Sequence, residues 1–170
     1  VYVNSISGGT ASNIIPGLCT VTLSDGSTIT AEGKAVHSSR PEKGENAILA
    51  MENTLNAIAL APCDLLEKIH MIGRRFSDMY GSGIGLACDE EYYEGEFVHK
   101  NVVSPTMIES GEDYLDLTVN IRFSCLFTEA QVCDALRRFC AEEGGELREC
   151  LSLPAVYVSR EEPYLQKLAE

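Results

Sequence analysis

Residues 33 to 47 read Gly33-Lys34-Ala35-Val36-His37-Ser38-Ser39-Arg40-Pro41-Glu42-Lys43-Gly44-Glu45-Asn46-Ala47. This pattern predicts a strand that ends on His37, a turn around Pro41 and then the start of a helix. A neutral imidazole donates one hydrogen bond and accepts another, and its unperturbed pKa lies near neutrality. His37 is therefore a candidate catalytic or ligand-binding residue, although the spacing alone leaves an ordinary surface histidine equally open.

Two further motifs flank this stretch in the chain. Upstream stands Gly8-Gly9-Thr10-Ala11-Ser12-Asn13-Ile14-Ile15-Pro16-Gly17, and downstream stands Leu115-Asp116-Leu117-Thr118-Val119-Asn120-Ile121-Arg122. In this order the three motifs resemble those of the lid, or dimerisation, domain of M20 family zinc metallopeptidases. The most similar pattern is the long lid of the monomeric, carnosinase-like dipeptidases, and the resemblance spans nearly all of residues 1 to 160.

The resemblance implies roles for three residues in a lid that closes over a dipeptide or small peptide. By matching positions, His37 would donate a hydrogen bond to the substrate carbonyl oxygen as it becomes an oxyanion. Arg122 would clamp the terminal carboxylate, because a guanidinium can hold a carboxylate bidentately. Asn13 would orient that carboxylate or the adjacent amide. The plainer alternatives are a turn histidine, a surface ion pair and a turn asparagine, and three more residues either line the site or satisfy the backbone: Ser38, Ser39 and Asn120.

The metal ligands of the resembling enzymes lie in a separate catalytic domain, and this chain lacks them. Zinc is therefore expected only in a full-length parent, with no metal ligand here. Asp89-Glu90-Glu91 copies the letters of a family metal motif, but its place inside the lid leads us to interpret it as a solvated acidic loop. We expect a lid domain over residues 1–158, and over 159–170 the start of the return into the absent catalytic domain of the same polypeptide. Such a fragment would be inactive alone.

The net charge and the cysteine pattern indicate which binding partners and which redox compartment to expect. The chain of 170 residues has 13 basic and 26 acidic side chains, a formal charge of −13. Such a charge repels phosphate backbones and anionic membranes, so we expect neither nucleic acid nor a membrane as partner. The seven cysteines form no C-x-x-C pair, which argues against a disulfide framework or a zinc knuckle. We expect a cytoplasmic protein in a reducing compartment.

Hydrophobic periodicity and turn signals predict the elements of the fold. They comprise strands near 18–24 and 28–36 joined at Asp25-Gly26, helices over 45–61 and 63–80, strands near 95–104 and 114–122, a helix behind the capping box Thr128/Gln131, and a strand near 146–153. In the strand 114–122, alternate apolar residues should face inward and Arg122 outward. Alternation along 28–36 would bury His37, but the Ser-Ser-x-Pro turn after it weighs more heavily. This order predicts an α+β fold, an antiparallel sheet with helices on one face, which the family resemblance sharpens to a ferredoxin-like lid.

Two other functions stay open at this point. One is the dimerisation domain of an aminoacylase-like or desuccinylase-like M20 amidohydrolase, in which the histidine serves the neighbouring subunit. The segment 63–95 exceeds what a compact dimerisation domain needs, which favours the dipeptidase. The other is a ferredoxin-like ligand-binding module without enzymatic activity. The remaining histidines, His70 and His99, are expected to be structural or exposed.

Overall fold

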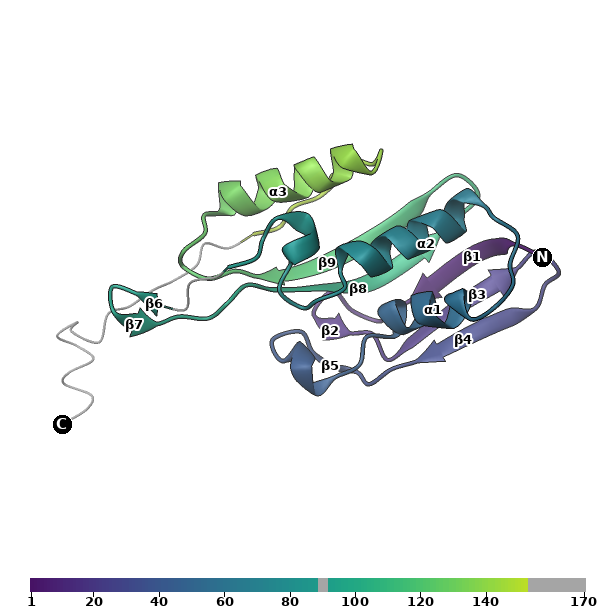
Figure 1. The fold of residues 1–170 in the computed structure, drawn as a ribbon, viewed down its shortest axis with the longest axis horizontal. Coiled ribbons are helices and arrows are strands. Elements are labelled where there is room, and N and C mark those ends of the chain that lie inside the picture. The colour runs from purple at the N-terminus through teal and green to yellow at the C-terminus, as the bar shows by residue number, and fades with distance from the viewer. Residues whose placement is uncertain (89–91, 153–170) are drawn as a thin grey trace. The chain divides into compact units, whose positions relative to one another are not determined.

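A computed structural model of the chain describes residues 1–88 and 92–152. These residues belong to two compact units. The first unit holds a five-stranded sheet, two helices and residues 33–47, called the His37 segment below. The second holds a short hairpin and one helix (Figure 1). The acidic run 89–91 and the expected return over 159–170 lie outside the described residues.

The sheet of the first unit is antiparallel throughout, with strand order β4-β3-β1-β8-β9. Its strands are β1 (Val3–Gly8), β3 (Leu18–Leu23), β4 (Thr28–Glu32), β8 (Val102–Ser110) and β9 (Leu115–Arg122). The predicted hairpin at Asp25-Gly26 joins β3 to β4, and Gly26 has the positive φ (85°) that such turns require. The fold class predicted from the sequence is confirmed.

The strand β1 is absent from the sequence prediction, although it lies between β3 and β8. Its sequence, VNSISG, is mostly polar, and of its residues only Val3 and Ile6 are buried. A segment with two large apolar residues gives too weak an alternating pattern for a strand to be predicted. Its place in the sheet comes from the backbone hydrogen bonds on both sides.

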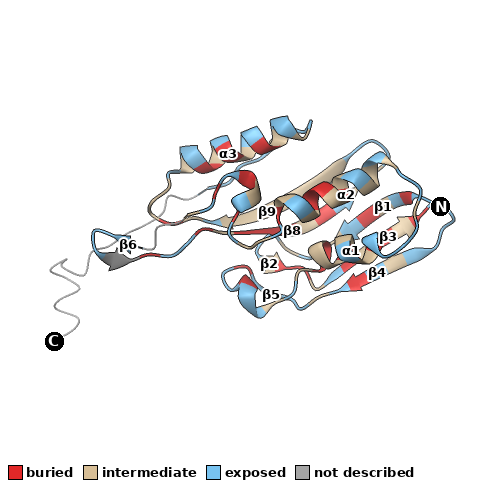
Figure 2. Cartoon of the chain, in the orientation of Figure 1, coloured by how far each residue is buried: buried red, intermediate tan, exposed pale blue. Residues whose placement is uncertain are grey.

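Helices α1 (Ala47–Asn56) and α2 (Asp64–Arg75) lie over one face of this sheet (Figure 1). Helix α1 contacts β3, β4 and β8, and α2 contacts β1. The buried side chains of α1 are Ala47, Ile48, Met51 and Leu55, and those of α2 are Ile69, Met71 and Ile72 (Figure 2). Burial of each large apolar side chain contributes roughly 1.5 to 3 kcal/mol. This contact fixes the sheet face that carries the core.

Both helices are shorter than the predicted 45–61 and 63–80. The side chain of Asn46 caps α1, and the chain leaves the helix after Asn56, so that Ile58 is 41% exposed. Helix α2 ends at Arg75, although the next residue, Phe76, is fully buried. The apolar pattern runs past the end of α2 because the buried Phe76 follows it, whereas the apolar residues after α1 are exposed or half-buried.

Two strand predictions also need correction. The expected strand 95–104 is instead the start of β8 at Val102, preceded by a separate hairpin. The strand β9 begins one residue later than predicted, and its residues from Leu115 to Ile121 are all half-buried, so their burial does not alternate as expected. As an edge strand, β9 pairs on one side only, and burial there does not follow strict alternation.

The second unit begins with the hairpin β6 (Tyr92–Tyr93) and β7 (Glu96–Phe97), whose turn has positive φ at both central residues. Its helix α3 (Glu129–Glu142) has the predicted capping box between Thr128 and Gln131. Residues 146–152 do not form the expected strand. None of the helices in the described part of the chain is long and apolar enough to cross a membrane.

Candidate functional site

His37 lies in a small two-stranded sheet outside the central one. Strand β5 (Val36–His37) pairs antiparallel with β2 (Ile14–Ile15), and Ile14 stands opposite His37. The next residue, Ser38, donates its backbone N–H to the carbonyl of Asn13 over 2.9 Å. The structure therefore brings Asn13 and His37 together, both exposed, and His37 is not part of the core that strand alternation would predict.

The segment that carries His37 folds back on itself. Lys34 and Glu45 exchange two backbone hydrogen bonds of 2.8 and 3.1 Å. Gly33 lies so close to the returning chain that a Cβ atom there would be 2.2 Å from the carbonyl oxygen of Glu45. Pro41 starts a short 3-10 helix, η1 (Pro41–Lys43), which completes the turn. The glycine and proline positions of the motif thus have a structural role.

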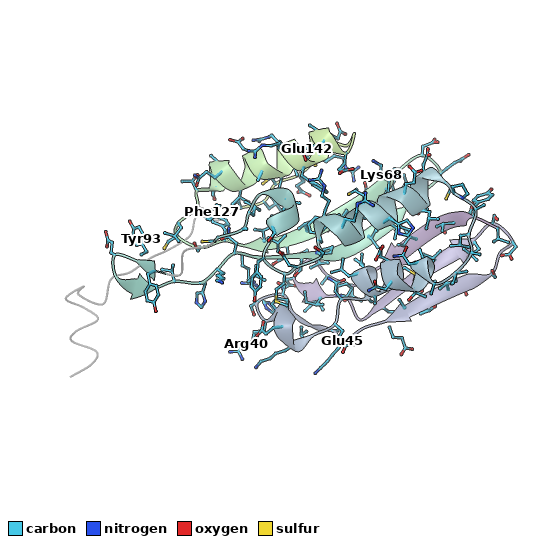
Figure 3. The ribbon with its side chains drawn as sticks, viewed as in Figure 1. Arg40, Glu45, Lys68, Tyr93, Phe127 and Glu142 are labelled. Atoms are coloured by element: carbon cyan, nitrogen blue, oxygen red, sulfur yellow. The ribbon has the colours of Figure 1, made fainter. Side chains whose placement is uncertain are left out.

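Asn46 ties this segment to the rest of the first unit. Its Oδ1 atom accepts the backbone N–H of Ile48 over 3.0 Å and so caps α1. Its Nδ2 atom donates to the carbonyl of Pro105 in β8 over 2.8 Å. On the outer side of the segment, the side chains of Arg40 and Glu45 point away from the ribbon (Figure 3). His37 is thus held on a turn anchored at its base.

Contacts within the turn decide which ring nitrogen of His37 carries the proton. The backbone N–H of Ser39 donates to Nδ1 over 3.2 Å, and the Ser39 hydroxyl lies 2.8 Å from the same atom. Because a backbone N–H can only donate, Nδ1 must accept, and the neutral ring carries its proton on Nε2. That nitrogen has no hydrogen-bond partner among the described residues. Its N–H is available to an external acceptor.

Ser38 is one of the residues that could line the site, but its side chain is buried, with 1% exposure. Its Oγ atom has no hydrogen-bond partner in the described structure. A buried hydroxyl without a partner costs about 1 to 3 kcal/mol. Ser38 holds the turn through its backbone, while Ser39 contacts the imidazole.

Arg122 is the last residue of β9 and stands opposite Val102 of β8. It is exposed, and its side chain makes no hydrogen bond or ion pair with any residue that the structure describes. The surface ion pair that an acidic chain favours is therefore not observed here. No hydrogen bond or ion pair joins Arg122 to His37 or Asn13 in the described structure, so the link between the predicted carboxylate clamp and these two residues stays a prediction. Asn120, the other polar candidate on this strand, is half-buried.

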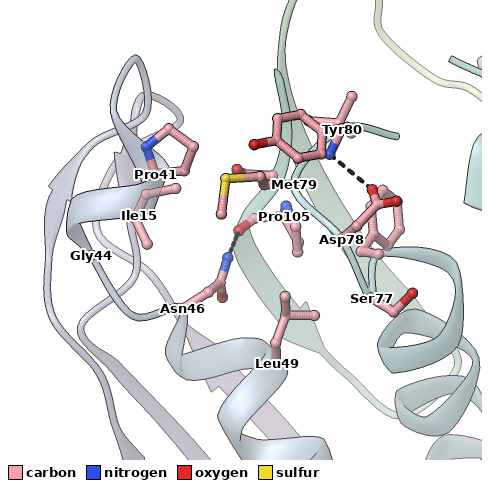
Figure 4. Close-up of a pocket in the computed structure, with 13 residues that line it drawn as sticks. Ile15, Pro41, Gly44, Asn46, Leu49, Ser77, Asp78, Met79, Tyr80 and Pro105 are labelled. Carbon is pink, nitrogen blue, oxygen red and sulfur yellow. Dashed lines mark hydrogen bonds between the residues drawn. The ribbon is translucent and has the colours of Figure 1, made fainter. Parts of the chain in front are cut away.

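A hollow of about 280 Å³ lies beside the His37 segment (Figure 4). Pro41 and Asn46 form one wall, and Asp78 and Tyr80 form the opposite wall. None of the three predicted site residues lines it. The second wall was not predicted from the sequence, because the pattern of residues 63–80 indicated one helix, whereas α2 ends at Arg75.

Asp78 orders this wall. Its Oδ1 atom accepts the backbone N–H of Tyr80 over 2.8 Å and of Ser82 over 3.4 Å. Partial burial by itself would raise the pKa of Asp78, but the hydrogen bonds from Ser82 and Tyr80 outweigh it and hold the pKa below its ordinary value of 3.8. The ionised carboxylate is thus favoured in the folded state.

Asp78→Asn should lower the free energy of unfolding by about 0.5 to 1.5 kcal/mol at pH 7, because the charge-assisted hydrogen bonds become neutral ones. A lowered folded pKa stabilises the fold above the unfolded pKa, and this stability is lost as the pH falls through the folded pKa. The difference between the two proteins should therefore begin to shrink near pH 3.8 and disappear once the pH is below the lowered pKa of Asp78 in the folded state. Urea denaturation over a pH series measures it, and a difference that persists in acid would contradict the assignment to the Asp78 charge.

The residues at 1–88 and 92–152 include no group of three or more His, Cys, Asp or Glu side chains that could hold a metal ion. Of the remaining histidines, His70 on α2 has its Nδ1 atom 3.1 Å from Oε1 of Glu52 on α1, and His99 is exposed.

A family model, the peptidase dimerisation domain of the M20 family, matches residues 24–148. The chain belongs to this family. The match includes the His37 segment and Arg122 and begins after Asn13. Membership of the M20 dimerisation domains indicates a hydrolase parent, and it implies association with a catalytic domain or a partner chain. No curated protein matches the chain.

Proposed function

We propose that this M20 dimerisation domain is the substrate-covering lid of a zinc-dependent, carnosinase-like dipeptidase. In this proposal it supplies oxyanion and carboxylate contacts for peptide-bond hydrolysis, and the isolated chain is inactive. The zinc and its ligands belong to the catalytic domain, because the described residues here do not fit a metal site. The substrate is a dipeptide or small peptide.

The observation that carries the proposal is the free Nε2–H of His37. During hydrolysis of a peptide bond, negative charge develops on the carbonyl oxygen, and a donor already aimed at that oxygen stabilises the transition state more than the substrate. Ser39 fixes the proton on Nε2, so the ring needs no change of tautomer before it donates. His37 is therefore suited to the oxyanion contact once the lid closes.

Arg122 supports the second contact. It is exposed and has no acidic partner among the described residues, so its guanidinium can pair with a substrate carboxylate without first breaking an ion pair. Asn13, held next to His37 through the backbone of Ser38, offers an amide for the same carboxylate or the adjacent peptide group. Both contacts require lid closure, because neither residue lies in an enclosed pocket.

The substrate class is tested on the full-length parent with free dipeptides and with N-acylated amino acids. Preferential hydrolysis of dipeptides by a monomer in sedimentation supports the proposal. Preference for N-acylated amino acids by an obligate dimer would instead support an aminoacylase-like or desuccinylase-like enzyme and overturn the dipeptidase assignment.

Arg122→Lys in the parent should lower kcat/KM for substrates with a free C-terminus by about 10- to 100-fold, mainly through KM. The loss corresponds to one charged hydrogen bond, about 1.5 to 3 kcal/mol, on a carboxylate that is present in ground and transition states alike. Steady-state kinetics with matched dipeptides and dipeptide amides measures the effect. Equal impairment of both substrates would remove the clamp role.

A further inference from the structure

Two free cysteines of the second unit lie in unusually close contact. The Sγ atoms of Cys133, on α3, and Cys150, in the segment after it, are 2.7 Å apart. This separation is shorter than the van der Waals contact of two sulfur atoms, and the two residues are 17 positions apart in the chain. No role in the proposed function involves either thiol.

The path of the chain after α3 brings the two thiols together. Gly144 takes a positive φ of 71°, and the N–H of Gly145 donates to the carbonyl of Cys140 over 2.7 Å, which reverses the chain. From Cys133 to the helix end the rise is about 15 Å at 1.5 Å per residue. The six residues after Gly144 span up to about 20 Å when extended, enough to return alongside the helix, as Figure 1 shows.

We propose that Cys133 and Cys150 form a reversible redox modification site, which low-molecular-weight disulfides convert to an intramolecular disulfide. The exposed Cys150 thiolate attacks one sulfur of the small disulfide, and the first small thiolate leaves. The Cys133 thiolate then attacks the Cys150 sulfur and releases the second small thiolate. The two cysteines are oxidised, the small disulfide is reduced to two thiols, and these take up the two protons that the cysteines lose.

The exchange at this pair is expected to be slow. The pKa of the Cys150 thiol is raised to about 11, first because it shares a hydrogen bond with Cys133 and also because of partial burial. Since only the thiolate attacks a disulfide, the exchange is slow near neutral pH. We therefore expect oxidation only after a sustained rise in the concentration of small disulfides. Disulfides that form in reducing compartments are usually transient or redox-sensing in this way.

The site is tested on the 170-residue chain, incubated with oxidised glutathione, alkylated with iodoacetamide and digested with trypsin. Cleavage after arginine places Cys150 on the peptide 149–160, Cys140 on 139–148, and Cys133 together with Cys125 on 123–137. Mass spectrometry should detect a cross-link between 123–137 and 149–160 that disappears on reduction. Two alkylated or separately glutathionylated cysteines in the oxidised chain would overturn the proposal.

Serine variants distinguish the two cysteines that share a peptide. Cys125→Ser should retain the cross-link, whereas Cys133→Ser should abolish it and leave Cys150 joined to glutathione. A cross-link that survives in Cys133→Ser, or that is lost in Cys125→Ser, would show that Cys125 is the partner of Cys150 and would contradict the proposal.

Discussion

His37→Ala in the full-length parent should lower kcat by about 10² to 10³ and leave KM nearly unchanged. Loss of one oxyanion donor costs about 2.7 to 4 kcal/mol of transition-state stabilisation. The contact strengthens only as the carbonyl oxygen gains charge, so substrate binding in the ground state should change little. The free Nε2–H, fixed by the two contacts of Ser39 with Nδ1, is the structural basis of this expectation.

The matched control is Arg40→Ala, three residues further along the same turn. The Arg40 side chain points away from the ribbon (Figure 3), and its backbone N–H, which donates to the His37 carbonyl over 3.1 Å, is kept in the variant. Arg40→Ala should therefore retain wild-type kcat, and the zinc content of both variants should equal that of the parent. Unaltered kcat in His37→Ala would make His37 an ordinary turn residue.

Local signals in the sequence predicted the parts of the fold that depend on neighbouring residues. The Asp25-Gly26 hairpin and the Thr128 capping box are found as expected, because both are decided within a few residues. The strand β1 could not be predicted, since only two of its residues are large and apolar and its alternation is too weak. The end of α2 was placed too late, because Phe76 is buried by tertiary packing and not by continuation of the helix.

The candidate site divides in the same way. The turn after His37 predicted its exposure, and a serine two residues later is a local partner that explains the tautomer. The hydrogen bond from Asn46 to Pro105 joins residues 59 positions apart, and no pattern within the segment reveals it. The proximity of Asn13 and His37 likewise depends on the pairing of β2 with β5. Strands of two residues are too short to give a recognisable sequence pattern.

Gly33→Ala should destabilise the chain by about 1 to 3 kcal/mol, the cost of forcing an extra methyl group into a well-packed site. The new Cβ atom would lie 2.2 Å from the carbonyl oxygen of Glu45 and 2.9 Å from the backbone nitrogen of Ala47. Because both atoms belong to the backbone, no side-chain rotation relieves the clash, and the hydrogen bonds between Lys34 and Glu45 must lengthen or break. Urea denaturation followed by circular dichroism measures the loss.

Two other glycines separate this clash from ordinary effects of replacing glycine. Gly145→Ala should be nearly neutral, since its nearest neighbouring atom would be 3.8 Å away, whereas Gly26→Ala should cost about 1 kcal/mol because its φ of 85° is strained for alanine despite open space. If Gly33→Ala were as stable as Gly145→Ala, the chain could not be folded back at Lys34 and Glu45 in solution. The turn would then lose its anchor at the base, and a fixed position for the His37 donor would no longer follow from the structure.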